Sequence, residues 1–105
     1  MNFADTERHD HALGNIENIL KEVPAATVEV VCHGSGINLV LRKDAKHAEK
    51  VAALIKQGVH FVACENTMKK KELNKDKLMA GVATVPSGAV EVLRKQQEGY
   101  GYFKP

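Results

Sequence analysis

Residues 44–67, DAKHAEKVAALIKQGVHFVACENT, contain the pattern that decides the fold class. Apolar side chains recur at helical spacing through residues 45–57, and Asp44 precedes them as a capping residue. Gly58 ends this predicted helix, as a glycine at a helix C-terminus commonly does, and an apolar strand over residues 59–64 follows at once. A helix that leads directly into a buried strand is the unit from which parallel α/β sheets are built.

The same alternation of helical and strand-like patterns continues toward both ends of the chain. The strand-like segments are short, β-branched and mostly apolar, which is typical of strands covered on both faces. This pattern predicts a single α/β domain over residues 1–105 with a mainly parallel sheet. The remaining predicted elements are helices over about residues 7–22, 66–73 and 88–98, and strands over about residues 27–32, 82–85 and 100–104.

The two ends of the predicted domain carry the least regular patterns. A doubly wound sheet begins with a strand, but only residues 2–4 precede the first helix, so the first strand is expected to be short or partly missing. Near the other end, Ser87 is a capping residue that opens the last helix. Val90 and Leu93 are expected to face the core from this helix.

Composition limits the classes of partner and location. The chain has 44% hydrophobic and 27% charged residues, which is ordinary for a globular domain. A net charge of +2 and few aromatic residues argue against nucleic-acid binding. No apolar run is long enough to span a bilayer, and the N-terminus is polar, so a cytoplasmic location is expected. In that compartment the two cysteines are expected to be free thiols.

Polar and reactive residues follow three of the predicted strands. In open parallel sheets, ligands bind outside the carboxyl ends of the strands, and parallel strands share a direction. We therefore expect these residues to lie along one edge of the sheet. The three segments are CHGSG at residues 32–36, CENT at residues 64–67 and PSG at residues 86–88.

Cys64 is the best candidate for a reactive group. It ends a predicted strand and precedes a helix N-terminus, where unpaired amides and the helix dipole favour a thiolate. Lys69, Lys70 and Lys71 add positive potential, whereas Glu65 opposes it. The same position also fits a buried structural cysteine, because free cysteine is among the most buried residue types.

The neighbouring residues allow more than one interpretation. Cys32 closes an apolar strand and is expected to be structural, unless it faces the site and forms a redox pair with Cys64. His33 fits a base, a hydrogen-bond partner for a bound anion, or a solvent-facing loop residue. Gly34 and Gly36 permit tight turns and close approach of the backbone.

No metal or cofactor site is predicted. His9 and His11 flank Asp10, but residues two apart on a helix face different directions, so we interpret them as part of a solvated surface. His47 and His60 are distant in sequence and complete no ligand set with metal spacing. The glycine-containing turn at residues 33–36 is too short for a dinucleotide fingerprint or a phosphate loop.

Three runs of sequence together resemble a known family. They are VEVVCHGSGINLVL at residues 28–41, VAALIKQGVHFVACENTMKKKEL at residues 51–73, and VATVPSGAVEVLRKQQEGYGYFKP at residues 82–105. An HGxG turn, a CxNT segment and a VPSG cap in this order resemble the DsrE/DsrF-like proteins of the sulfur-relay superfamily. The resemblance is to a small, mostly uncharacterised branch and covers nearly the whole chain.

This resemblance implies a three-layer α/β/α fold of flavodoxin-like topology that assembles into trimers or hexamers. In sulfur-relay members, a cysteine at the position matching Cys64 carries a persulfide and passes it between donor and acceptor proteins by thiol exchange. By this resemblance, Asn66 and Thr67 would line the pocket around the cysteine together with the turn at Gly34 and Gly36. His33 and Ser87, which belong to the same strand ends, complete the set of candidate binding residues.

Three functions follow from these observations. The first is a sulfur carrier or sulfurtransferase subunit that uses the Cys64 thiolate as nucleophile. The second is a non-catalytic binding or assembly module, in which the strand ends hold a small anion or nucleotide-like ligand and Cys64 is part of the wall. The third is a thiol redox sensor, which requires Cys32 and Cys64 to lie within bridging distance.

Overall fold

The computed structural model describes residues 6–43 and 45–102. The predicted strand over residues 2–4, the cap at Asp44 and the chain from residue 103 onward lie outside this range. The described elements are α1 (Thr6–Glu22), β1 (Glu29–Cys32), the 3₁₀ segment η1 (Gly34–Val40), α2 (Ala45–Lys56), β2 (His60–Cys64), α3 (Glu65–Lys70), the 3₁₀ turn η2 (Lys75–Lys77), β3 (Ala83–Val85) and α4 (Gly88–Gln97).

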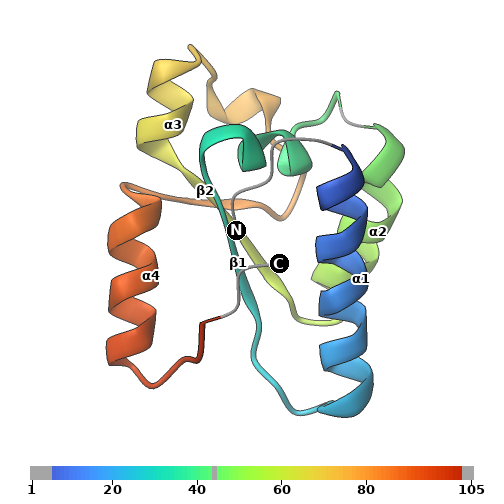
Figure 1. The fold of residues 1–105 in the computed structure, drawn as a ribbon. Helices are drawn as coiled ribbons and strands as arrows, with labels where there is room; N and C mark the ends of the chain where they lie inside the picture. Colours follow the sequence, from blue (N-terminus) through green and yellow to red (C-terminus); the bar gives the residue numbers. More distant parts are fainter. Residues whose placement is uncertain (1–5, 44, 103–105) are drawn as a thin grey trace.

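The described residues form a parallel sheet of three strands in the order β1-β2-β3. Val31 lies beside Val62 across the first pair of strands, and Cys64 lies beside Val85 across the second. Figure 1 shows α1 and α2 on one side of the sheet and α4 on the other, so the chain folds in three layers. The predicted α/β/α architecture with a parallel sheet is confirmed.

The main core lies between the sheet and the pair formed by α1 and α2. Leu13 and Ile16 of α1 pack there with Leu54 of α2 and Phe61 of β2. The sequence pattern does not decide the structure of the apolar stretch after β1, which forms η1. Its buried side chains Ile37, Leu39 and Val40 close one end of this core. Burial of these apolar groups provides most of the favourable free energy of folding.

The predicted orientation of α4 is wrong. Val90 and Leu93 are 49% and 62% exposed, whereas Gly88 and Glu91 of the same helix are buried. Two contacts with β1 fix the rotation of this helix. Gly88 lies very close to the end of β1, and the Glu29 carboxyl group of β1 faces Glu91 and Lys95. The side chains of Val90 and Leu93 therefore point away from the sheet.

Other boundaries differ from the prediction in smaller ways. The described residues 100–102 of the predicted last strand do not form a strand. Helix α3 begins at Glu65, with Cys64 in the capping position, and not at Asn66 or Thr67. No helix in the described part of the chain is both long and apolar enough to cross a membrane.

Candidate site at the Cys64 thiol

Cys64 lies at the carboxyl end of the middle strand, where β2 meets α3. Its backbone is extended, with φ −75° and ψ 116°, and the first helical residue is Glu65. Cys64 is a free thiol and is 5% exposed. The thiol therefore occupies the strand-to-helix junction that the sequence predicts, in an environment from which most water is excluded.

The first residue of α4 donates a hydrogen bond to this sulfur. The Gly88 N–H lies 3.3 Å from Cys64 Sγ in a buried environment. Ser87 caps the same helix, and its hydroxyl accepts from the Val90 N–H at 3.4 Å, so the Gly88 amide remains available for the thiol. The N-terminus of a helix favours negative charge, and α4 therefore stabilises a thiolate.

The surroundings lower the pKa of the Cys64 thiol. Burial raises this pKa, because removal from water disfavours the charged form. The nearby donor groups, namely the backbone amides of Thr67, Gly88 and Asn66 and the Thr67 hydroxyl, act in the opposite direction and outweigh burial. Of these, the Gly88 N–H makes the hydrogen bond described above. Donors that point at a sulfur stabilise the thiolate more than the neutral thiol, and the thiolate is the nucleophilic form.

A glycine at the start of α4 lets this helix lie very close to the end of β1. A Cβ atom at Gly88 would lie 3.1 Å from His33 Cβ and 3.3 Å from both His33 Cγ and Val31 Cγ1. Such distances are tighter than ordinary van der Waals contact. The missing side chain lets α4 approach His33 and place its first amide against Cys64.

The turn after β1 reaches the same site through Thr67. The Gly34 N–H donates to Thr67 Oγ1 at 3.0 Å, and Gly34 has φ +57°, a conformation that glycine adopts without strain. The Gly36 N–H donates to the His33 carbonyl at 3.0 Å and closes the turn. The ends of all three strands therefore converge around Cys64.

Comparison with known proteins places this geometry in a family. The model of the DsrE/DsrF-like family matches residues 2–105. The chain belongs to the DsrE/DsrF-like family. A solved structure of MTH1491 from Methanobacterium thermoautotrophicum, a protein of unknown function, is similar to this chain, with a TM-score of 0.94 and 33% sequence identity. The match covers 99% of this chain and 93% of that one. No curated protein matches significantly.

The other predicted site residues of this DsrE-like domain have unequal roles. Asn66 is exposed and acts on the thiol through its backbone amide. His33 is half-buried and lies against Gly88. The predicted set misses Gly88 as a donor, although a glycine directly after the Ser87 cap was a visible signal for close backbone approach.

Charged side chains contribute less to the site than the sequence suggests. The main causes of the lowered Cys64 pKa are amides and one hydroxyl, whereas Lys69, Lys70 and Lys71 are exposed on or just beyond α3. The Glu65 carboxylate accepts a hydrogen bond from Thr84 Oγ1 of β3 at 2.7 Å. A cavity of about 590 Å³ begins beside Glu65 and extends along α3 to Lys75, so the junction adjoins an open surface.

Cys32 is not part of the Cys64 site. It lies beside Ala63 in the sheet register, and neighbouring residues along β2 point to opposite faces, so the two thiols face opposite sides. Cys32 is buried in the main core, and burial raises its pKa to about 12. This geometry agrees with a structural role for Cys32. It does not agree with a redox pair, because a disulfide requires the two Cβ atoms to point toward each other.

The prediction of a solvated surface is wrong for His9, which is buried, whereas His11 is exposed as predicted. His9 and His47 are buried, with ring centroids 5.6 Å apart in an edge-to-face contact, and His47 Nε2 lies 2.8 Å from Asp10 Oδ1. These contacts join α1 to α2. Within residues 6–43 and 45–102, no group of three or more potential ligands could hold a metal ion.

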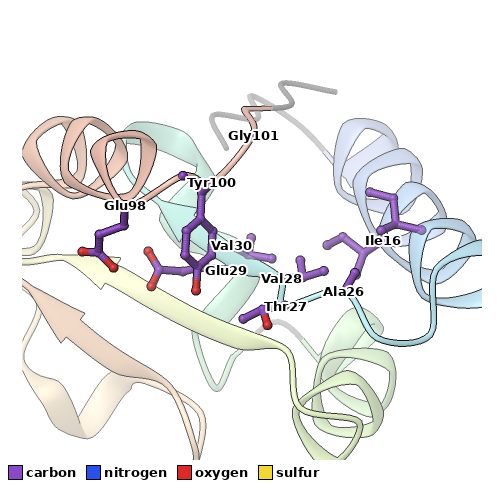
Figure 2. Close-up of a pocket in the computed structure, with 11 residues that line it drawn as sticks. Ile16, Ala26, Thr27, Val28, Glu29, Val30, Glu98, Tyr100 and Gly101 are labelled. Carbon is purple, nitrogen blue, oxygen red and sulfur yellow. The ribbon is translucent and has the colours of Figure 1, made fainter.

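A separate cavity of about 500 Å³ lies far from the thiol, at the amino end of β1 (Figure 2). Ile16 of α1 and Val28 form part of its apolar wall, and Glu29, Glu98 and Tyr100 supply polar groups. Because parallel sheets bind ligands at the carboxyl ends of their strands, this cavity is on the wrong edge to serve the Cys64 chemistry.

Proposed function

We propose that this domain carries sulfur as a persulfide on Cys64 within the sulfur-relay chemistry to which its family is linked. The observation that carries the proposal is the Gly88 N–H at the start of α4, which donates to Cys64 Sγ at 3.3 Å. A structural cysteine in a core needs no such donor, whereas a nucleophilic thiolate does. A reducing compartment, such as the cytoplasm, would keep the thiol free between transfers.

Sulfur uptake is a thiol-exchange reaction. The Cys64 thiolate attacks the outer sulfur of a persulfide R–S–SH and forms a new S–S bond, while the old S–S bond breaks and R–S⁻ leaves with the electron pair. The products are Cys64–S–SH and the donor thiolate, so no external oxidant or reductant is needed. The donor is a small-molecule or protein persulfide, and the later acceptor is a small-molecule or protein thiol.

Substitution of Cys64 tests the proposal directly. After incubation with inorganic polysulfide, the wild-type protein is expected to gain the mass of one or more sulfur atoms, and Cys64→Ser is expected to gain none. A small donor is the right probe because Cys64 is only 5% exposed. Intact-mass measurement followed by peptide mapping locates the added sulfur.

Cys32→Ser is the matched control for this experiment. Cys32 is buried with a pKa of about 12, so this variant is expected to take up sulfur as the wild type does. Added sulfur on Cys64→Ser, or none on the wild type with polysulfide or a low-molecular-weight persulfide, would contradict the proposed function.

We also propose that the domain assembles into a homo-oligomer, a trimer or hexamer by the family resemblance, through the outer face of α4. Val90 and Leu93 lie three residues apart on this face and are 49% and 62% exposed. The charged side chain of Glu91 is turned inward instead. The helix therefore exposes apolar side chains while it buries a charged one. Such an exposed apolar face is stabilised when a second copy of the chain covers it.

Leu93→Glu is expected to weaken this assembly by at least about tenfold, because a charge would replace one leucine side chain of the contact. Analytical ultracentrifugation over a concentration series gives the association constant. Gln57→Glu adds the same charge at an exposed position just after α2, on the opposite side of the sheet from α4, and is the control. Equal association by the two variants, or a monomeric wild type, would exclude α4 as the interface.

A further inference from the structure

The cavity along α3 starts at the strand ends that hold the reactive thiol. Glu65, which follows Cys64 in the chain, lines it, and so does Pro86, which follows Val85, the sheet partner of Cys64. Its volume of about 590 Å³ lies within the range of pockets that bind small molecules. We call this space the α3 cavity.

Apolar side chains line part of the α3 cavity. Met68 is buried in the main core, and Leu73 is partly buried and packs against the same core. The Leu73 N–H donates to the Met68 carbonyl at 2.8 Å, which fixes the chain at the end of α3. The wall is therefore preformed, and its apolar part suits the carbon chain of a small ligand.

The charged groups of the α3 cavity favour an anion. Lys69 of α3 and Lys75 of η2 both line it and are exposed. Within residues 6–43 and 45–102, neither ammonium group pairs with a carboxylate. Glu65 is the acidic residue of the wall, and its carboxylate already accepts the Thr84 hydroxyl at 2.7 Å. The two ammonium groups are therefore available to carboxylates of a bound molecule.

Asn74 adds a neutral donor next to Lys75 in the chain. Its Oδ1 accepts the Asp76 N–H at 3.1 Å, which leaves the N–H groups of the side-chain amide for a ligand. Asp76 itself lines a neighbouring cavity instead. Donors from α3 and from the η2 segment thus face one space.

We propose that the α3 cavity binds the small molecule that exchanges sulfur with Cys64: a low-molecular-weight thiol or persulfide whose carboxylates contact Lys69 and Lys75. This inference rests on the proposed function and names the substrate class of that site. The carboxylates hold R while R–S–SH gives its outer sulfur to the Cys64 thiolate and leaves as R–S⁻. One turn of α3, about 6 Å, separates Glu65 from Lys69, so a short carbon chain spans this part of the cavity.

Alkylation of Cys64 by iodoacetate and by iodoacetamide tests the preference for an anion, because the first reagent is charged and the second is neutral. Both react with the thiolate, so the ratio of their rate constants does not depend on the thiol pKa. In the double variant Lys69→Gln and Lys75→Gln, this ratio is expected to fall about fivefold at low ionic strength. Peptide mapping verifies that Cys64 is the alkylated residue.

Asn74→Asp tests the same preference without removing a lysine. Aspartate keeps an acceptor for the Asp76 N–H, adds a negative charge to the wall and removes the amide donors. The ratio of iodoacetate to iodoacetamide rate constants is expected to fall about threefold.

The double variant Lys70→Gln and Lys71→Gln is the matched control. It removes the same charge from exposed positions that do not line the α3 cavity, so the ratio should change less than about twofold. In loaded protein, sulfur transfer to 3-mercaptopropionate relative to 2-mercaptoethanol should fall only in the variants of the cavity wall. Circular dichroism verifies that all variants are folded.

The outcomes separate this inference from the proposed function. An unchanged ratio in Lys69→Gln and Lys75→Gln, an equal fall in the two double variants, or no reaction of wild-type Cys64 with either reagent would overturn the anion site. Alkylation requires no persulfide, so a fall confined to the cavity variants supports the site even if the wild type takes up no sulfur, and only the proposed function then fails. Sulfur uptake with an unchanged ratio has the opposite meaning.

Discussion

Gly88→Val is expected to lower the free energy of unfolding by about 2 kcal/mol, within the range that overpacking of a close-packed site costs. The Cβ atom alone would lie 3.1 Å from His33 Cβ and 3.3 Å from Val31 Cγ1, and the two methyl groups of valine need further space. The start of α4 must then move away from β1. Urea denaturation followed by circular dichroism measures the change.

The same movement is expected to reduce the reactivity of Cys64. The Gly88 N–H now donates to Cys64 Sγ at 3.3 Å, and displacement of α4 lengthens this hydrogen bond. Loss of one donor to the thiolate raises the thiol pKa and slows alkylation near neutral pH by about tenfold. A single substitution therefore links the packing of α4 to the proposed chemistry.

Gly14→Val is the control for both effects. Gly14 lies within α1, and a Cβ atom there would have nothing within 4 Å. Replacement of a glycine in a helix interior is expected to be neutral or to stabilise by a few tenths of a kcal/mol. If Gly88→Val were as stable and as reactive as Gly14→Val, close packing at the start of α4 would not control the thiol.

The fold class could be predicted because its signals are local. Residues 45–64 show a helical period, a terminating glycine and a strand within one short segment, and the structure contains α2, Gly58 and β2 in that order. Cys64 could be placed at the strand-to-helix junction for the same reason. These features depend on neighbours in sequence, which periodicity and capping rules describe.

The features that could not be predicted depend on contacts between distant segments. Whether Cys32 faces Cys64 depends on the strand register, which sets Cys32 beside Ala63, and a shift of one residue would reverse the result. The rotation of α4 depends on Gly88 packed against His33, and no periodicity within the helix reveals that contact. The helical spacing of Val90 and Leu93 predicts that both face the core, whereas both are exposed in the structure.

A second long-range contact beneath α4 joins two carboxyl groups. Glu29 of β1 faces Glu91 of α4, and the Glu29 side chain is 12% exposed. Lys95 Nζ lies 3.8 Å from Glu29 Oε2, while Glu29 Oε1 is buried and has no hydrogen-bond donor among the described residues. Two carboxyl groups form a hydrogen bond only when the pair holds a proton.

This arrangement predicts a loss of stability as the pH rises. Burial, followed by the hydrogen bond to Glu91 and the charge of Glu91, raises the pKa of Glu29 from 4.5 to about 7, although Lys95 opposes the change. The folded state therefore binds a proton that the unfolded state has released between these two values. The contribution to stability is complete below about pH 4.5 and is lost as the pH rises through 7.

Glu29→Gln is expected to remove this pH dependence. The glutamine amide can donate to Glu91 at every pH. The free energy of unfolding of this variant at pH 8 should therefore exceed that of the wild type by about 1 kcal/mol. This figure is reduced for solvent screening and for the lost attraction between Glu29 and Lys95. At pH 5 the two proteins should differ little. Urea denaturation at pH 5, 6, 7 and 8 gives both curves.

Glu98→Gln distinguishes the carboxyl pair from a general effect of charge on α4 or beside it. Glu98 is exposed and contacts the same Lys95 Nζ at 3.5 Å, so its substitution removes one negative charge and leaves the pair of Glu29 and Glu91 intact. This variant should keep most of the fall in stability between pH 5 and 8. If Glu29→Gln kept the same fall, or were less stable than the wild type at pH 8, the carboxyl pair would not hold a proton in the folded state. The position of α4 on β1 would then depend on the close contact at Gly88 and on the ion pair between Lys95 and Glu29.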